Sequence, residues 1–174
     1  RIYSPVLPDT LYFAGERVPM DIYYVREALD REILSNTYWH TNTILNMKRA
    51  HRFFPVIEPI LKRYGVPEDF KYLCVIESSL TNATSPAKAQ GYWQFVKATG
   101  KKYGLEISDE LDMRNSLEAS TEAACKFLKA LYRQFGSWTL AAAAYNCGEN
   151  GLQRQINLQD VRNYYDLRLN SETA

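Results

Sequence analysis

Residues 116–135, "SLEASTEAACKFLKALYRQF", constrain the fold of this 174-residue chain more than any other stretch. The residues of one face recur at spacings of three and four: Leu117, Thr121, Ala124, Leu128 and Leu131. This spacing predicts a long amphipathic α-helix whose apolar face must be covered by other elements. Gly136 ends the helix, and Ser137 is placed to cap the next one, "WTLAAAAYN", which closes at Gly148.

The rest of the chain shows the same period. Helical spacing begins at Asp21, which is placed as a cap, and recurs over 38–52 and over 56–64, where Pro55 stands near the start. Further helices are predicted over 68–80 and, shorter, in "WQFVKATGKKYG". No stretch alternates as a β-strand does. We therefore expect one all-α domain of about eight helices over residues 21–174, preceded by an extended arm, residues 1–20, rich in proline.

The composition limits the classes of function that are open to this chain. The net charge is +1, which gives no field to attract nucleic acid or an anionic membrane. His40 and His51 offer no metal site of recognisable spacing, and there is no glycine-rich phosphate loop. Three cysteines, Cys74, Cys125 and Cys147, lie in helix-like stretches and favour buried free thiols over disulfides.

One carboxylate, Glu77, interrupts the apolar stretch "LCVIESSL" at residues 73–80. On a helix it shares one stripe with Phe70, Leu73 and Cys74. A carboxylate among apolar side chains loses hydration, so its pKa rises, and a carboxyl group that keeps its proton near neutral pH suits a general acid. The alternative from this pattern alone is that Glu77 points to water at the helix end or pairs with a lysine.

Three short motifs follow in order along the chain: Glu77-Ser78, Gly91-Tyr92-Trp93-Gln94 and Ala144-Tyr145-Asn146. With these motifs and flanking segments such as "FFPVIEPILKRYGVPEDFKYL", the chain resembles the lytic transglycosylases of the soluble lytic transglycosylase (SLT) family. The resemblance extends over about 18–173 and is greatest to the membrane-bound murein transglycosylase D type.

The resemblance implies a goose-lysozyme-like helical fold with a cleft that binds a peptidoglycan glycan strand. It also implies cleavage of the bond between N-acetylmuramic acid and N-acetylglucosamine without water. Glu77 would protonate the leaving oxygen and then accept the proton of the muramoyl C6 hydroxyl, which attacks C1 and closes a 1,6-anhydro ring. Neither a cofactor nor a metal is expected.

The remaining site residues implied by the resemblance bind the substrate. Ser85 would orient the N-acetyl group, and Gln94 would bond to the sugar near the cleavage point. Tyr145 would bond to Glu77 or to the sugar, and Asn146 would fix the loop or the substrate. Tyr92 could offer a ring face to a sugar.

Other residues of these segments are expected to be structural. Trp93 is expected in the core, and Asp112 with Arg114 as a structural ion pair. The four alanines at 141–144 are expected to let their helix approach the Glu77 helix closely.

Two features depart from the family pattern. Lys88 stands where the family usually has glycine, so it is strained if that position needs a positive φ. As a cation at the cleft rim it could face carboxylates of the muramoyl lactyl group or peptide. After "NSETA" the family continues toward a tyrosine of the site that has no match here, so the C-terminal end is expected to be truncated and one wall of the cleft to be missing.

Two rival functions stay open at this point. A hydrolytic muramidase would use the same fold with water as nucleophile, normally with a second carboxylate, and a non-catalytic peptidoglycan-binding protein would need only the cleft. The substrate implies the periplasm or outer membrane of a bacterium, with any membrane anchor outside this chain, and the protein is expected to be a monomer.

Overall fold

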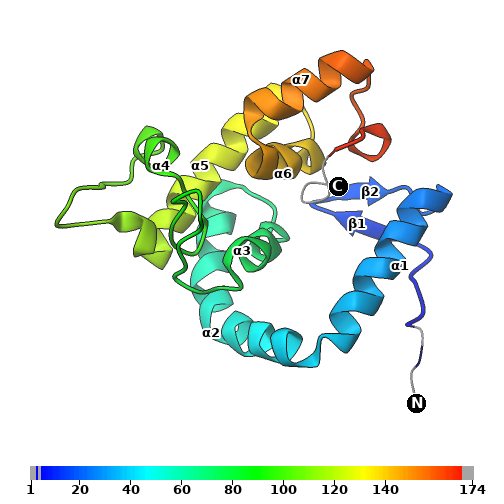
Figure 1. The fold of residues 1–174 in the computed structure, drawn as a ribbon, viewed down its shortest axis with the longest axis horizontal. Helices are drawn as coiled ribbons and strands as arrows, with labels where there is room; N and C mark the ends of the chain where they lie inside the picture. The colour runs from blue at the N-terminus through cyan, green and yellow to red at the C-terminus, as the bar shows by residue number, and fades with distance from the viewer. Residues whose placement is uncertain (1–2, 4, 170–174) are drawn as a thin grey trace.

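The computed structural model describes residue 3 and residues 5–169 of the chain. Within them the chain forms seven α-helices, one short β-hairpin and two 3-10 helices, which confirms the predicted all-α class (Figure 1). The α-helices are α1 (Tyr23–Tyr38), α2 (His40–Tyr64), α3 (Phe70–Ser78), α4 (Lys97–Lys102), α5 (Leu117–Phe135), α6 (Trp138–Cys147) and α7 (Glu149–Gln159). The strands are β1 (Leu11–Phe13) and β2 (Glu16–Val18), and the 3-10 helices are η1 (Met113–Asn115) and η2 (Tyr164–Asp166).

Helix α5 is the central element of the fold, as its periodicity predicted. All five predicted positions of its apolar face, from Leu117 to Leu131, are buried. Helix α2 packs against one part of α5 and α6 against another, so α5 joins both halves of the core (Figure 1). Ser116 caps α5 by accepting a hydrogen bond from the Ala119 amide at 3.3 Å, and Gly136 ends the helix in the left-handed conformation.

Residues 40–64 form a single helix, whereas the sequence predicted two, with Pro55 near the start of the second. Pro55 and Pro59 lie inside α2, four residues apart and both exposed. Each proline removes one amide from the helical hydrogen bonds, but on the solvent face the carbonyl groups left without a donor can bond to water. Because Ile57 and Leu61 are buried on the opposite face, tertiary packing keeps the helix continuous.

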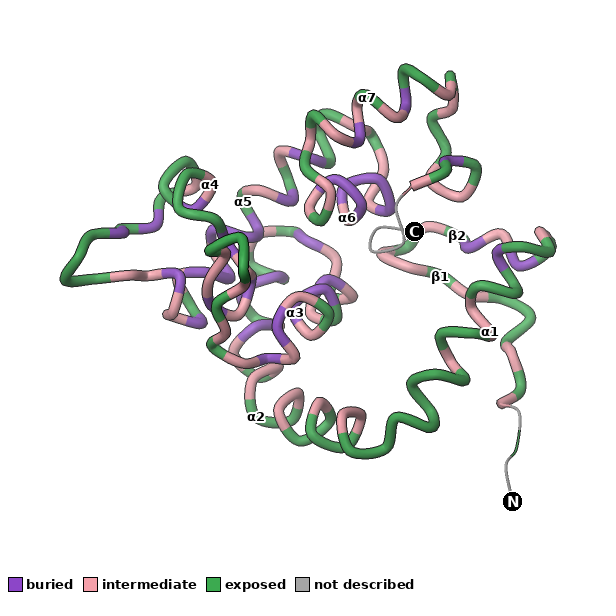
Figure 2. The backbone as a smooth tube through the Cα atoms, viewed as in Figure 1, coloured by how far each residue is buried: buried purple, intermediate pink, exposed green. Residues whose placement is uncertain are grey.

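Helix α1 and the N-terminal half of α2 form an arch that projects from the packed body of the molecule (Figures 1 and 2). Val25 is buried in α1, where it packs with Val18, but most residues of α1 are exposed. The prediction that Asp21 caps α1 was wrong, because the helix begins after Ile22 with no side-chain cap. The Asp21 carboxylate lies instead 3.5 Å from the Arg17 guanidinium.

The sequence did not predict the β-hairpin, because strands of three residues are too short to show an alternating pattern. Strands β1 and β2 are antiparallel, with Phe13 opposite Glu16. Ala14 and Gly15 connect them with φ values of 53° and 80°, as tight hairpin turns require. The N-terminal arm therefore contains regular secondary structure. Its contacts with the rest of the fold are described below.

Three further features concern the chain as a whole: its cysteines, the length of its apolar helices and its C-terminal end. Cys74 and Cys125 are buried free thiols as predicted, whereas Cys147 is only half-buried. Across the described ranges, no helix is both long and apolar enough to cross a membrane. Residues 170–174, where the predicted domain 21–174 ends and its truncation was expected, lie outside the described residues.

Candidate active site

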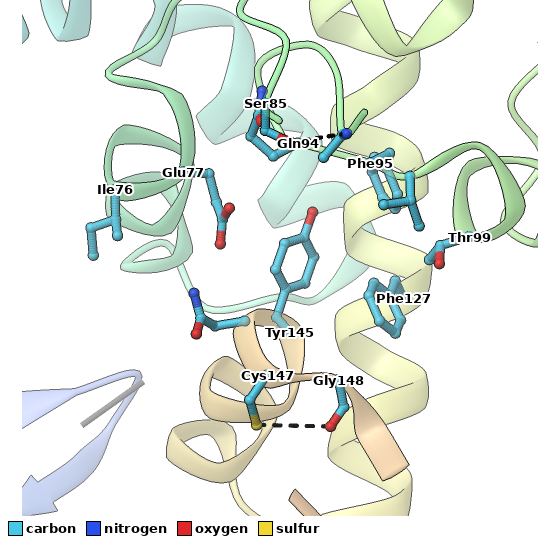
Figure 3. Close-up of a pocket in the computed structure, with 13 residues that line it drawn as sticks. Ile76, Glu77, Ser85, Gln94, Phe95, Thr99, Phe127, Tyr145, Cys147 and Gly148 are labelled. Carbon is cyan, nitrogen blue, oxygen red and sulfur yellow. Dashed lines mark hydrogen bonds between the residues drawn. The ribbon is translucent and has the colours of Figure 1, made fainter. Parts of the chain in front are cut away.

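Glu77 is the penultimate residue of α3, and Ser79 ends the helix with a φ of 51° (Figure 3). Phe70, Leu73 and Cys74, which share its stripe, are buried as predicted. Glu77 is half-buried, and its Oε1 has no hydrogen-bond partner among the described residues. Burial raises the pKa of Glu77 from its ordinary 4.5 to about 7. Such a carboxyl group can both give and take a proton at neutral pH.

Ser78, the second residue of the Glu-Ser pair, ties α3 to the loop at residues 83–95. Its buried hydroxyl donates to the Tyr92 carbonyl oxygen at 2.8 Å. The thiol of Cys74 donates to the same oxygen at 3.3 Å. Both bonds hold the end of α3 at a fixed distance from the loop, so the role of Ser78 is structural.

The loop at 83–95 folds back on itself through its glycine and glutamine. Gly91 has a φ of 83°, and a Cβ there would lie 1.8 Å from the Arg114 carbonyl oxygen, so no larger residue fits. Gln94 also has a positive φ of 49°, and its Nε2 donates to the carbonyl oxygens of Ala83 and Gly91 at 2.9 and 2.8 Å. The Gly-x-x-Gln spacing therefore closes a turn and leaves Oε1 of Gln94 to accept a bond from a ligand.

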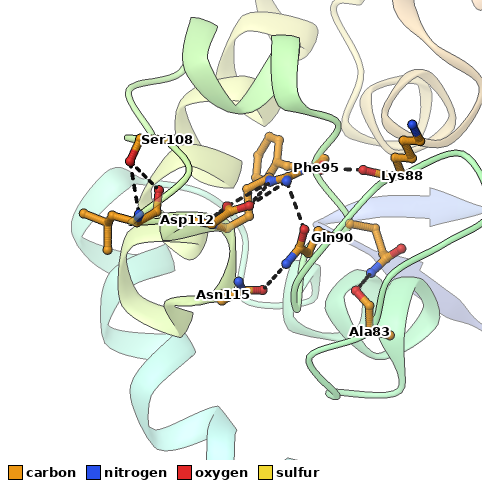
Figure 4. A network of polar contacts seen from close by, with 10 residues as sticks. Ala83, Lys88, Gln90, Phe95, Ser108, Asp112 and Asn115 are labelled. Carbon is orange, nitrogen blue, oxygen red and sulfur yellow. Dashed lines mark hydrogen bonds and ion pairs between the residues drawn. The ribbon is translucent and has the colours of Figure 1, made fainter.

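A buried guanidinium, that of Arg114, holds the other side of this loop. Figure 4 labels its partners Lys88, Gln90, Phe95 and Asp112. Its Nη1 donates to the carbonyl oxygens of Phe95 and Lys88 at 3.1 and 3.2 Å, and its Nη2 to Gln90 Oε1 at 2.9 Å. Its Nη2 also lies 2.6 Å from Asp112 Oδ2, which confirms the predicted structural ion pair. The bond from Arg114 lowers the pKa of Asp112, so the pair stays charged.

Lys88 has a φ of 62°, the left-handed conformation that glycine adopts most easily. Its amide donates to the Ser85 carbonyl oxygen at 2.9 Å, and Ser85 Oγ accepts a bond from the Ala89 amide at 3.0 Å. These bonds hold the turn despite its strain, and the Lys88 side chain is exposed.

Helix α6 brings Tyr145 and Asn146 to the site at its C-terminal end. The Tyr145 hydroxyl donates to the Trp93 carbonyl oxygen at 2.7 Å, whereas the sequence predicted Glu77 or a sugar as its partner. Burial raises the pKa of the Tyr145 phenol well above its usual range, and the charge of Glu77 adds to this. The neutral phenol therefore links α6 to the loop that carries Gln94.

One pocket of about 830 Å³ brings the predicted residues Glu77, Ser85, Gln94, Tyr145 and Asn146 together (Figure 3). Three separate segments supply them: α3, the loop at residues 83–95, and α6. Other lining residues, which no motif predicted, include Ile76, Phe95, Val96, Thr99, Phe127 and Cys147. Phe95, Val96, Thr99 and Phe127 line it because the loop, α4 and α5 meet there, which the sequence pattern does not encode.

Tyr92 is the predicted site residue that does not line this pocket. Its ring packs against Phe53 of α2 with 5.4 Å between the ring centroids. Its neighbour Trp93 is fully buried and donates from Nε1 to Thr121 at 2.8 Å, which confirms the core prediction. Trp93 lies in the loop instead of the predicted short helix, because α4 begins only at Lys97.

A second pocket of about 280 Å³ shares Ile76, Glu77 and Asn146 with the first, so Glu77 lies where the two pockets adjoin. Further walls of the second pocket are Phe13 from β1, Leu73 from α3, Ala142 and Ala143 from α6, and Tyr164 and Tyr165 from η2. The predicted close approach of the alanines to α3 is therefore not made at Ala142 and Ala143, although Trp138 at the start of α6 packs against Phe70 of α3. Helix α6 packs on α5, and its small side chains leave space in front of α3.

Glu77 is the one carboxylate among the described residues that line the two pockets. In the described part of the chain, no group of three or more His, Cys, Asp or Glu side chains is arranged to hold a metal ion. The site therefore offers one proton-transferring group, with hydroxyl and amide groups around it.

Comparison with known proteins identifies the family of the domain that contains these pockets. The sequence profile of the transglycosylase SLT domain matches residues 55–167, which include α3, the loop and α6 but exclude the hairpin. The chain is 32% identical over 174 residues to the membrane-bound lytic murein transglycosylase D of Escherichia coli strain K12, and equally to that of strain O6:H1 CFT073.

The extent of these matches differs between the chain and its relatives. The two Escherichia coli alignments cover 95% of this chain and 38% of each relative, so the chain spans about two fifths of their length. A protein of Alteromonas sp. strain M-1, named for tributyltin chloride resistance, is 31% identical over 126 residues, or 71% of this chain and 61% of that protein. With the SLT profile matched over residues 55–167 of a helical, lysozyme-like fold, the chain belongs to the transglycosylase SLT domain family.

Proposed function

We propose that this protein is a lytic transglycosylase that cleaves the bond between N-acetylmuramic acid and N-acetylglucosamine in peptidoglycan. The observation that carries the proposal is Glu77, a half-buried carboxyl group with a pKa of about 7 where two pockets of an SLT-domain fold adjoin. The name of the Escherichia coli relatives, murein transglycosylase, supports the same substrate class.

In the first step the protonated Glu77 carboxyl group donates its proton to the glycosidic oxygen. The bond from C1 of the muramoyl residue to that oxygen breaks, and its electron pair stays on the oxygen, so the N-acetylglucosamine side leaves as an alcohol. The positive charge that develops at C1 is stabilised by the N-acetyl group of the substrate and by polar atoms of the cleft. Ser85 and Gln94 line the same pocket and would contribute those atoms.

In the second step the Glu77 carboxylate accepts the proton of the C6 hydroxyl of the same muramoyl residue. The C6 oxygen attacks C1 and closes the 1,6-anhydro ring. Glu77 returns to its protonated form, no water is consumed, and the products contain the same atoms as the substrate. One group serves as acid and then as base, for which a pKa near the working pH is best suited.

The absence of a second carboxylate in the described lining of both pockets favours this lyase reaction over hydrolysis. Glycoside hydrolases of the usual type place two carboxyl groups across the bond, the second one to activate water or to attack C1. Glu149, which borders an adjoining hollow, is instead paired with Lys102 at 3.6 Å.

The proposal is tested by digesting purified murein in water enriched in oxygen-18 and measuring the masses of the released muropeptides. We expect 1,6-anhydro ends that carry no heavy oxygen and are lighter by one water than hydrolytic products. Reducing ends with heavy oxygen would identify a muramidase. Binding to murein with no released product would identify a non-catalytic binding protein.

Location and assembly follow from the same substrate. Peptidoglycan lies outside the cytoplasmic membrane of bacteria, so we infer that the protein acts in the periplasm or at the outer membrane. We infer a monomer because α3, the loop and α6 of one chain supply the predicted groups of the cleft.

A further inference from the structure

The β1–β2 hairpin lies outside the residues matched by the family profile, yet it contacts both helices that carry the candidate site. We propose that this hairpin is a clamp that sets the spacing of α3 and α6, with Glu16 as its positioning residue. The proposal rests on the proposed function for its activity readout, and a second readout below is independent of activity.

The first contact of the clamp is the Glu16 carboxylate at the N-terminus of α6. It accepts bonds from the amides of Trp138 and Thr139 at 2.5 and 2.9 Å and from the Ser137 hydroxyl at 2.8 Å. The Thr139 hydroxyl also donates to it. Burial opposes the charge of Glu16, but these bonds outweigh that effect and lower its pKa, so the carboxylate stays ionised against the positive end of α6.

The second contact is at the tip of the hairpin, on the helix that carries Glu77. The amide of Ala14 donates to Asp69 Oδ2 at 2.7 Å. Asp69 occupies the N-cap position of α3, but its side chain makes no capping bond to that helix. Its carboxylate instead accepts the bond from Ala14 of the hairpin. The hairpin therefore bonds to the N-termini of both α3 and α6.

A row of aromatic rings runs along the same path. Phe13 of β1 packs against Phe70 of α3 with ring centroids 5.5 Å apart, and Phe70 packs against Trp138 of α6 at 5.4 Å. Trp138 in turn stacks on Tyr132 of α5 at 4.2 Å. The hairpin, α3, α6 and the central helix are thus joined at one end of the site.

The site residues lie at the other end of the same helices. Glu77 follows Phe70 by seven residues and Tyr145 follows Trp138 by seven, which is about two turns along the same helix face, or about 10 Å. Helices α3 and α6 are not among the helix pairs that pack closely in the described chain, and a pocket lies between them. At the site end the two helices are joined through the loop, by Ser78 to the Tyr92 carbonyl and by Tyr145 to the Trp93 carbonyl. At the opposite end the hairpin bonds to the N-termini of both helices, so it braces their spacing there.

The test compares Glu16→Gln with a matched control, Arg17→Gln, which changes the adjacent exposed residue. Gln keeps the size of Glu16 but turns an NH₂ group toward amide donors. We expect kcat on soluble murein strands to fall by about 10-fold or more, because small misplacements of catalytic groups have large effects on rate, with KM changed less than about twofold. We expect amide exchange to rise over residues 138–147, but not over 117–135. The control should match the wild type in both.

Two outcomes would overturn the proposal. In one, exchange rises in Glu16→Gln while kcat stays at the control value, so the bonds are only a helix cap. In the other, neither quantity changes. Should Glu16→Gln fail to melt cooperatively, Asp69→Ala decides, because it removes the other contact and must lower kcat in the same way.

Failure of the clamp and failure of the proposed function are distinguishable. A wild-type protein that releases no anhydro products contradicts the proposed function. In that case amide exchange, which needs no substrate, is measured in both variants. The clamp requires that Glu16→Gln raise exchange over α6 and that Asp69→Ala raise it over α3, and a rise in α6 alone would leave only a helix cap.

Discussion

The proposed chemistry depends on the carboxyl group of Glu77. The environment of this group predicts how the activity depends on pH. The protonated form starts the reaction, and burial places its pKa at about 7. We expect kcat/KM for murein strands to be constant below about pH 6 and to fall about tenfold per pH unit above about pH 8. Initial rates from pH 5 to 9 measure this. A rate that rises through neutral pH would contradict it.

The same burial predicts that Glu77 reduces the stability of the fold. The folded pKa of about 7 lies above the ordinary 4.5, so the folded state binds the proton more tightly. This group therefore makes the free energy of unfolding fall as pH rises from about 4.5 to 7. We expect Glu77→Gln to raise the free energy of unfolding by about 1–3 kcal/mol at pH 8. The difference should vanish near pH 4, where the carboxyl group is neutral in both states. Urea unfolding at the two pH values checks this, and a destabilised variant at pH 8 would contradict it.

At the scale of residues, the sequence predicted the stripe of Glu77 and the residues of the pocket better than their partners. Periodicity gives the face of a helix, and the resemblance to the SLT family identified Ser85 and Gln94. The carbonyl group of Trp93 as the partner of Tyr145 depends on where a loop crosses a helix, and no local pattern records that. Tyr92 turns toward Phe53 for the same reason.

Among the elements, the loop at 83–95 depends on a single guanidinium. Arg114→Met would leave Asp112 without its ion pair and the carbonyl groups of Lys88 and Phe95 without a donor. We expect the free energy of unfolding to fall by about 3 kcal/mol and activity to fall with it, because the loop carries Gln94. Denaturant unfolding measures the first effect. Arg26→Met, on the exposed face of α1, is the control and should change the free energy of unfolding by less than about 0.5 kcal/mol.

Element boundaries were predicted well where caps decide them and poorly where packing does. Ser116 and Gly136 bound α5 as expected. By contrast, Pro55 does not interrupt α2, since the buried face of the helix outweighs the lost hydrogen bonds. The hairpin is stabilised by partners more than a hundred residues away, such as Thr139 for Glu16, so its short strands gave no local signal.

At the scale of the whole molecule, the accessibility of the three thiols predicts which of them an alkylating reagent modifies in the folded chain. Cys74 and Cys125 are buried, and burial raises the pKa of Cys125 to about 12. Cys147 is half-buried and lines the large pocket. We expect iodoacetamide to modify Cys147 alone in the native, reduced protein and all three cysteines in urea. Intact mass and peptide mapping measure this, and modification of Cys74 in the native state would contradict the fold.

The fold class and the predicted lining of the large pocket followed from the sequence, but the way distant segments complete the site did not. The second pocket combines Phe13 from the N-terminal hairpin with Tyr164 and Tyr165 from the C-terminal part of the described chain. Their meeting depends on the path of the chain around α6. The lining of the second pocket therefore extends beyond the region matched by the family profile, because Phe13 of the hairpin contributes to it.

The most direct test of the central claim compares murein digestion by the wild type and by Glu77→Gln, with product masses measured over time. Gln is close in size to Glu but cannot transfer the proton, so we expect the initial rate of 1,6-anhydro product release to fall by about 10³-fold while cooperative unfolding is retained. Release of the same products by Glu77→Gln at the wild-type rate would contradict the assignment of Glu77 as the catalytic acid and base.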